Sequence, residues 1–252
     1  MSDGNRLPAF FRLERFEEID STNEELKRRA ARGAGEGTLI WAGAQTGGRG
    51  RRGRSFVSPP GNLYMSMLLR PERAPARAAQ LGFAGALAVG EAALPLLPQA
   101  ADLAYKWPND VLIDGRKTCG ILLESQAAAS GALEWLIVGI GVNLVSFPAG
   151  LETPATSLTA SGAAPVSPET MLARVAGRFL FWYERWLGEG FAPLRQAWLA
   201  RAQGLGRPIR VRLGDGESEG RFAGLDEEGA LLLESGPVRR RITAGDVFPA
   251  AR

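Results

Sequence analysis

The sequence contains no histidine and a single cysteine, Cys119, among its 252 residues. Without histidine the chain cannot form a Ser-His-Asp triad or a Cys-His pair, and it has no imidazole to bind zinc or haem. A single cysteine excludes an intrachain disulfide, a four-cysteine zinc site and an iron–sulfur cluster. Any chemistry must therefore depend on carboxylates, lysine, arginine, backbone amides or a metal ion held by other ligands.

Long apolar runs are also missing. No run reaches the roughly 18 apolar residues of a membrane-spanning helix. The first ten residues lack the basic and then apolar order of a signal peptide. With almost no cysteine as well, we expect a cytoplasmic protein that does not bind membranes. The composition, 45% hydrophobic and 23% charged, is typical of a globular chain with a sizeable core.

Lysine is scarce too, with three residues against 27 arginines. The net charge of +3 is too small to indicate a nucleic-acid partner by itself. Genomic codon bias explains the arginine excess most simply. Because arginine does not replace the compact ammonium of lysine at a tight site, the retained lysines are of functional interest. They are Lys27, Lys106 and Lys117.

The pattern of apolar residues predicts two domains. Residues 1–204 read as a mixed α/β domain, and 205–252 contain four or five short strands with turns, which is typical of a small β-barrel. Ser21 and Thr22 each stand three residues before a glutamate, which predicts a capping box at the first helix. Residues 75–94 predict one packed helix. Ser167 followed by proline predicts the start of another.

Glycine and arginine alternate in the segment QTGGRGRRGRS at 45–55. Its G-x-G-x-x-G would indicate dinucleotide binding only if a helix followed, and Pro59 and Pro60 prevent that helix. Arginine forks match carboxylate and phosphate oxygens, so the pattern favours a loop that folds over an anionic ligand. A solvated surface loop and an RNA-binding segment remain alternatives. The arginines are Arg49, Arg51, Arg52 and Arg54.

Two further motifs carry candidate ligand groups. In KWPND at 106–110, Asn109 and Asp110 offer the oxygen ligands that Mg²⁺ prefers, and nearby lysines would face phosphates. An ordinary turn is the alternative. In GIGVN at 139–143, small residues allow close backbone approach, and Asn143 can pair with an amide or purine edge. The alternative there is a β-bulge with a turn.

These motifs occur together in a distinctive order. DSTN at 20–23, QTGGRGRRGR at 45–54, KWPND at 106–110, GRKTCGIL at 115–122 and GIGVN at 139–143 are followed by DEEGALLLE at 226–234. The set resembles the biotin protein ligases (biotin–[acetyl-CoA-carboxylase] ligases) over nearly the whole chain. The resemblance implies an α+β fold: a mixed-sheet, class II synthetase-like catalytic domain at 1–204 and a C-terminal SH3-like β-barrel at 205–252.

The resemblance also implies an activity. Such a ligase is ATP-dependent and AMP-forming, and it uses Mg²⁺. It activates biotin to biotinyl-5′-AMP and then transfers biotin to a specific lysine of a biotin carboxyl carrier protein. No covalent enzyme intermediate is needed, so the missing histidine is compatible with this reaction. Catalysis would rest on alignment and on neutralising phosphate charge.

By the same resemblance, site roles fall on matching positions. The catalytic residues would be Lys117, Arg49 and Arg51. Biotin would be bound by Ser21, Thr22, Asn23, Gln45, Gly48, Arg49, Gly50, Arg51, Lys117 and Gly120. ATP would be bound by Arg51, Arg52, Arg54, Lys106, Trp107, Asn109, Lys117 and Asn143. Asp110 would hold Mg²⁺.

One departure from some relatives bears on partners. About 20 residues precede the Ser-Thr-Asn motif, too few for the winged helix-turn-helix of repressor relatives, so we expect no DNA partner. A homodimer is an open expectation, since some relatives dimerise. The alternatives are a lipoate or octanoate ligase, disfavoured by GRGRRGR, and a non-catalytic nucleic-acid-binding protein. The latter would use the run 239–241 (RRR) and leaves KWPND unexplained.

Overall fold

A seven-stranded mixed sheet organises the larger part of the molecule. The computed structural model describes residues 6–150, 152–214 and 216–250. The strand order is β1-β2-β3-β7-β6-β5-β4, and only β1 and β2 pair in parallel. The strands are β1 (Arg12–Ile19), β2 (Thr38–Gln45), β3 (Leu63–Leu69), β4 (Leu103–Lys106), β5 (Asp110–Ile113), β6 (Arg116–Ala127) and β7 (Leu133–Val142).

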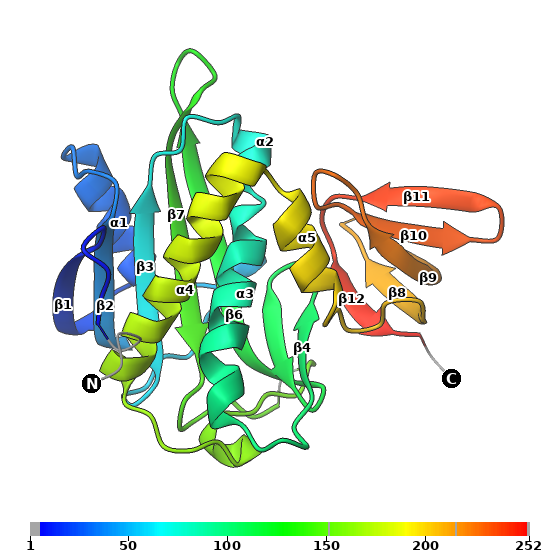
Figure 1. Ribbon diagram of the computed structural model, residues 1–252, viewed down its shortest axis with the longest axis horizontal. Coiled ribbons are helices and arrows are strands. Elements are labelled where there is room, and N and C mark those ends of the chain that lie inside the picture. Colours follow the sequence, from blue (N-terminus) through cyan, green and yellow to red (C-terminus); the bar gives the residue numbers. More distant parts are fainter. Residues whose placement is uncertain (1–5, 151, 215, 251–252) are drawn as a thin grey trace.

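Helices cover the two faces of this sheet unequally. On one face lie α3 (Leu81–Ala93), α4 (Pro168–Glu189) and α5 (Ala192–Leu199) (Figure 1). On the other, α1 (Thr22–Ala31) packs Leu26 against Ile40. Neighbouring residues of a strand point to opposite faces, so Leu39 joins the core under α3 and α4 while Ile40 joins the core under α1. The small cover on the second face leaves room for a site there.

The apolar segment predicted as one helix is interrupted. It forms α2 (Pro75–Ala78) and then α3, whose residues are all buried except Glu91. A helix that is apolar all round belongs in a core. The stretch Pro75–Leu96 is long and apolar enough for a membrane span, but 72% of its most apolar window is buried inside the fold. It is therefore explained as the central packing helix.

The two predicted helix starts differ in outcome. Ser167 caps α4, because its side chain accepts a hydrogen bond from Thr170 N. The capping box at α1 was a wrong prediction, because Ser21 makes no side-chain cap bond. In a capping box, the glutamate accepts a hydrogen bond from the backbone N–H of the cap residue. Here the Ser21 N–H donates to Asp20 Oδ1 at 2.7 Å instead. The two glutamates of the first turn instead form ion pairs with basic side chains.

The C-terminal residues form a separate five-stranded antiparallel sheet, in the order β11-β10-β9-β8-β12. This small β domain confirms the predicted fold class; the boundary at 204 stays a prediction. It docks beside α5 (Figure 1), and Trp107 Nε1, between β4 and β5, donates to its Gly229 O at 3.0 Å. Its strands are β8 (Pro208–Arg212), β9 (Glu217–Leu225), β10 (Leu231–Ser235), β11 (Val238–Ile242) and β12 (Asp246–Pro249).

Candidate active site

A pocket of about 390 Å³ opens on the α1 face of the sheet. Strand β7 makes room for it, because Gly139 and Gly141 share the face of Ile137 and carry no side chain. A Cβ at Gly139 would lie 2.2 Å from Asn23 Oδ1, and one at Gly141 would lie 2.6 Å from the Phe56 ring. A side chain at either position would have to displace Asn23 or Phe56, so the two glycines keep this part of the pocket as it is.

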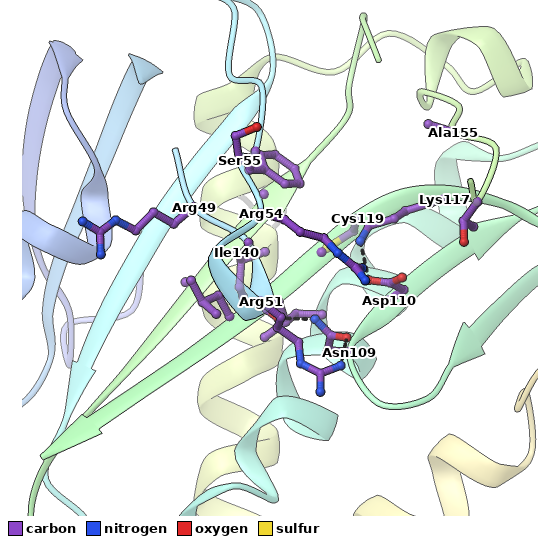
Figure 2. Close-up of a pocket in the computed structure, with 18 of the residues that line it drawn as sticks. Arg49, Arg51, Arg54, Ser55, Asn109, Asp110, Lys117, Cys119, Ile140 and Ala155 are labelled. Carbon is purple, nitrogen blue, oxygen red and sulfur yellow. Dashed lines mark hydrogen bonds and ion pairs between the residues drawn. The ribbon is translucent and has the colours of Figure 1, made fainter. Parts of the chain in front are cut away.

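The structure brings the predicted site residues together around this pocket, with two exceptions (Figure 2). Gly48 is buried inside the glycine–arginine segment, where a Cβ would lie 2.3 Å from Phe56 O. Arg52 points toward Asp246 of β12, at 3.4 Å. The predicted residues that line the pocket are Ser21, Thr22, Asn23, Gln45, Arg49, Gly50, Arg51, Arg54, Lys106, Trp107, Asn109, Asp110, Lys117, Gly120 and Asn143.

One end of the pocket is polar and carries hydrogen-bonding groups from α1 and β2. Thr22 N donates to Gln45 Oε1 at 2.9 Å, and Asn23 Nδ2 donates to Glu124 Oε2 at 2.8 Å. Ser66 Oγ lies 2.6 Å from Asn23 Oδ1. Thr22, Asn23 and Ser66 are buried and all these groups are bonded to one another, so their donors and acceptors are fixed in direction. Such an end suits the head of a polar, uncharged ligand.

The other end is cationic. Lys117 Nζ lies 2.6 Å from Asp110 Oδ1, and Lys106 Nζ donates to Thr153 Oγ1 at 3.0 Å (Figure 2). Burial lowers the pKa of Lys106, and the charge of Asp110 opposes that shift. Burial also lowers the pKa of Arg51, whose guanidinium donates to Asn109 Oδ1 at 3.2 Å. Cations that have lost water gain most from an anionic ligand, so this end suits phosphate.

The glycine–arginine loop (45–55) folds back on itself over the pocket. Gly50 N donates to Arg54 O at 2.7 Å, and the 3₁₀ turn η2 (Arg51–Gly53) lies between them. Ion pairs hold the loop at both sides: Arg49 with Glu24 of α1 at 2.9 Å, and Arg54 with Asp246 of β12 at 2.6 Å. The loop therefore links the larger domain to the small β domain.

Several residues of this site were not found from the sequence. Phe56 follows the loop directly, and Ser66 is the polar residue within an apolar strand; both patterns could have drawn notice. Asp246 and Phe248 carry no local signal, because the docking of the small domain alone brings them to the pocket. Burial raises the pKa of Asp246, but the hydrogen bond from Arg54 and the neighbouring arginine charges outweigh burial and lower it overall.

We expect Asp246→Asn to loosen the loop, because the charge that pairs with Arg52 and Arg54 disappears. Trypsin should cleave at 51–54 severalfold faster than in the unaltered protein. Asp226→Asn is the control, since Asp226 pairs with Arg241 within the small domain. Equal cleavage rates for both variants would contradict the role of Asp246. Because the pKa of Asp246 is lowered, the carboxylate stays ionised and paired at every pH above its ordinary pKa. Acid should therefore loosen the loop only as the pH falls through the lowered pKa.

A magnesium ion would depend on Asp110. The described residues contain no group of three His, Cys, Asp or Glu side chains that could hold a metal ion. Asp110 Oδ1 is buried, and its ion pair with Lys117 lacks hydrogen-bond geometry, so this oxygen accepts no hydrogen bond from the described residues. Mg²⁺ commonly takes one or two carboxylates together with substrate phosphates. The site fits a magnesium ion that arrives with a nucleotide.

Comparisons with known proteins agree with this geometry. Residues 16–143 match the Biotin/lipoate A/B protein ligase family, and 204–248 match the biotin protein ligase C terminal domain. A biotin–[acetyl-CoA-carboxylase] ligase of Paracoccus denitrificans is 44% identical over 234 residues, which are 91% of this chain and 97% of the relative. A bifunctional ligase/repressor of Bacillus subtilis is 35% identical over 91% of this chain and 71% of its own length.

The fold comparison points the same way. A biotin protein ligase from Aquifex aeolicus, solved in complex with biotin and ATP, superposes with a TM-score of 0.78 at 29% identity. The match covers 94% of this chain and 97% of that one. The chain therefore belongs to the biotin/lipoate A/B protein ligase family and, within it, to the biotin protein ligases.

Proposed function

We propose that the chain is an ATP-dependent ligase that activates biotin to biotinyl-5′-AMP and transfers biotin to one lysine of a biotin carboxyl carrier protein. The observation that carries this proposal is that one pocket has both an uncharged hydrogen-bonding end and a cationic end. Biotin has a polar, uncharged head and a carboxylate tail, and ATP brings the phosphates. The relatives named above support the same reaction.

In the first step, a carboxylate oxygen of biotin attacks the α-phosphorus of ATP, and the bond to pyrophosphate breaks. Ser21, Thr22, Asn23 and Gln45 would hold the head of biotin, so that its carboxylate lies near Lys117. The Lys117 ammonium would stabilise the charge that develops on the phosphate. Asp110 forms an ion pair with Lys117 in this structure, and it would bind Mg²⁺ that arrives together with ATP. Lys106, Asn109 and Asn143 would bind the nucleotide.

In the second step, the ε-amine of the carrier lysine attacks the carbonyl carbon of the mixed anhydride. The bond from that carbon to the phosphate oxygen breaks, and AMP leaves with its electron pair while the amine loses a proton. The glycine–arginine loop would keep water from the anhydride, because hydrolysis would waste the intermediate. Arg51 suits this role, since it contacts Asn109, the residue before β5, and the Gly245 carbonyl beside β12.

We expect Arg51→Gly to release activated biotin from the pocket. Without the contacts to Asn109 and Gly245, the loop should close less tightly over the adenylate. Bystander proteins mixed with the variant, ATP and biotin should then acquire biotin on many lysines, measured by streptavidin blotting. The control is Arg116→Gly, at the exposed start of β6 and outside the pocket. An Arg51→Gly variant that retains its adenylate as tightly as the unaltered enzyme would argue against a closing loop.

The proposed function is tested by incubating the protein with ATP, Mg²⁺, biotin and an apo carrier domain, followed by mass spectrometry of the carrier. We expect one biotinyl adduct on one lysine, and none when ATP is omitted. A parallel reaction with octanoate in place of biotin should leave the carrier unmodified. A carrier that gains no biotin, or gains octanoyl instead, would overturn the proposal.

The location follows from the reaction as a further part of the proposal. We place the enzyme in the cytoplasm, where ATP is available. Its one cysteine, Cys119, is a free and buried thiol. A chain with a single thiol gains nothing from an oxidising compartment. Fractionation of the cells that make the protein, with immunodetection of each fraction, tests this placement.

A further inference from the structure

Lys27 is the one lysine that the proposed reaction does not use. It lies on α1 with its Nζ 2.5 Å from Glu124 Oε1 of β6 and 2.7 Å from Glu24 Oε1. The other Glu124 oxygen, Oε2, accepts a hydrogen bond from Asn23 Nδ2 at 2.8 Å. Glu124 is therefore fixed from both sides, by an ammonium at the outer side and by the buried amide of a pocket residue at the inner side.

The Glu124 carboxylate sets the direction of the neighbouring hydrogen bonds. An ionised carboxylate can only accept, so the Asn23 amide must turn its NH₂ toward Glu124 and its Oδ1 toward Ser66. Ser66 Oγ lies 2.6 Å from Asn23 Oδ1 and 2.7 Å from Thr22 Oγ1. Because Ser66 has a single hydroxyl proton and Asn23 Oδ1 cannot donate, that proton goes to Asn23. The Thr22 hydroxyl has two neighbours for its one proton, Ser66 Oγ at 2.7 Å and Gln45 Oε1 at 3.2 Å.

This direction decides what the pocket presents to a ligand. Asn23 Oδ1 accepts the Ser66 proton with one lone pair and keeps a second, which suits a ligand N–H. If Asn23 flipped, its Oδ1 would face the Glu124 carboxylate, and the two oxygens would repel each other. Asn23 is only 4% exposed and lies against Gly139, so its side chain has no room to move away. A rotation of the amide by 180° in place is the rearrangement that remains. Glu124 prevents that flip.

We infer that Glu124, held by Lys27, is a positioning residue for the ureido ring of biotin, whose N–H groups need acceptors in a fixed direction. Glu124 acts through Asn23, which lines the pocket, and does not line the pocket itself. The inference rests on the proposed function, because it concerns the same pocket and ligand. It adds a partly buried link from Lys27 on α1 to the recognition of the biotin head.

The test compares Glu124→Leu with Glu124→Gln. Leucine removes both acceptors and should weaken biotin binding about tenfold or more, the range expected when a charge-assisted hydrogen bond is lost. Glutamine keeps one acceptor for Asn23, and Lys27 keeps Glu24, so affinity should recover to within about threefold of the unaltered protein. Lys27→Met should weaken biotin binding in the same direction as Glu124→Leu and less strongly. Calorimetric titrations with biotin and with ATP, each measured separately, give the affinities.

The matched control is Glu25→Leu. Glu25 is also a carboxylate with two basic partners, Arg28 and Arg29, but it does not contact Asn23. We expect that variant to bind biotin normally, and Glu124→Leu to bind ATP normally. Equal loss of biotin and ATP affinity in Glu124→Leu, or a glutamine variant no better than leucine, would overturn the inference. Biotin affinity unchanged in Glu124→Leu would overturn it too. Failure of the unaltered protein to bind biotin would instead overturn the proposed function.

Discussion

Replacing Lys117 by alanine is expected to slow formation of the adenylate by about 10²–10³-fold, the range seen when one preorganised charge-stabilising group is removed. Lys117 is placed for this role, because its Nζ lies 2.6 Å from Asp110 Oδ1 and only 3.3 Å from where a Cβ at Gly120 would lie. The ammonium is thus held between the pocket wall and the candidate magnesium ligand. It would act on charge that exists only as the phosphate reacts.

Biotin affinity should change little in the same variant, since the biotin head is held at the other end of the pocket. Rapid-quench measurement of pyrophosphate release gives the rate, and calorimetric titration gives the affinity. Arg116→Ala is the control, because Arg116 precedes Lys117 in β6 but is exposed at its start. If Lys117→Ala lost rate and biotin affinity in equal measure, Lys117 would be a binding residue and not a catalytic one.

The second large effect is expected from Gly139→Ala. The added Cβ would lie 2.2 Å from Oδ1 and 2.9 Å from Cγ of Asn23. Asn23 cannot yield easily, because Ser66 and Glu124 hold both ends of its amide. Overpacking of this kind costs about 1–3 kcal/mol. If that cost falls on the pocket, biotin affinity should drop about tenfold or more, while ATP affinity stays near that of the unaltered protein.

Gly188→Ala is the matched control for this change. Gly188 lies in α4, and a Cβ there would meet no atom within 4 Å. Alanine favours the helix more than glycine does, so this variant should be slightly more stable and bind biotin normally. Thermal unfolding should be recorded for both variants beside the biotin titration. A Gly139→Ala protein that binds biotin as well as the Gly188→Ala protein would show that Asn23 can move aside.

The two-domain organisation could be predicted from the sequence, because it depends on local patterns of apolar and turn residues. Short strands separated by turns predicted the small β domain, and five strands form there. The helix predicted at 75–94 was interrupted between α2 and α3. The capping box failed because Asp20 and Gln45, one of them distant in sequence, accept the N–H groups that the glutamates would have taken.

The residues of the candidate site likewise divide into those that local motifs identify and those that they do not. Residues within motifs, such as Asp110 and Lys117, could be named from the sequence, because spacing along β5 and β6 brings them together. Glu124 and Asp246 could not be named, because their importance depends on contacts across the fold. Glu124 reaches Asn23 from 101 positions away, and Asp246 reaches Arg54 from 192 positions away. Local patterns hold no information about such distant pairs.

The docking of the small β domain has a consequence for how the molecule unfolds. Phe222, Leu231 and Leu233 of that domain belong to the same apolar core as Phe83 of α3 and Trp198 of α5. Separating the two units would expose that shared surface to water and break the bond from Trp107 to Gly229. The chain should therefore melt in one cooperative calorimetric transition, and a fragment cut near residue 204 would lose both a wall of its pocket and part of its core.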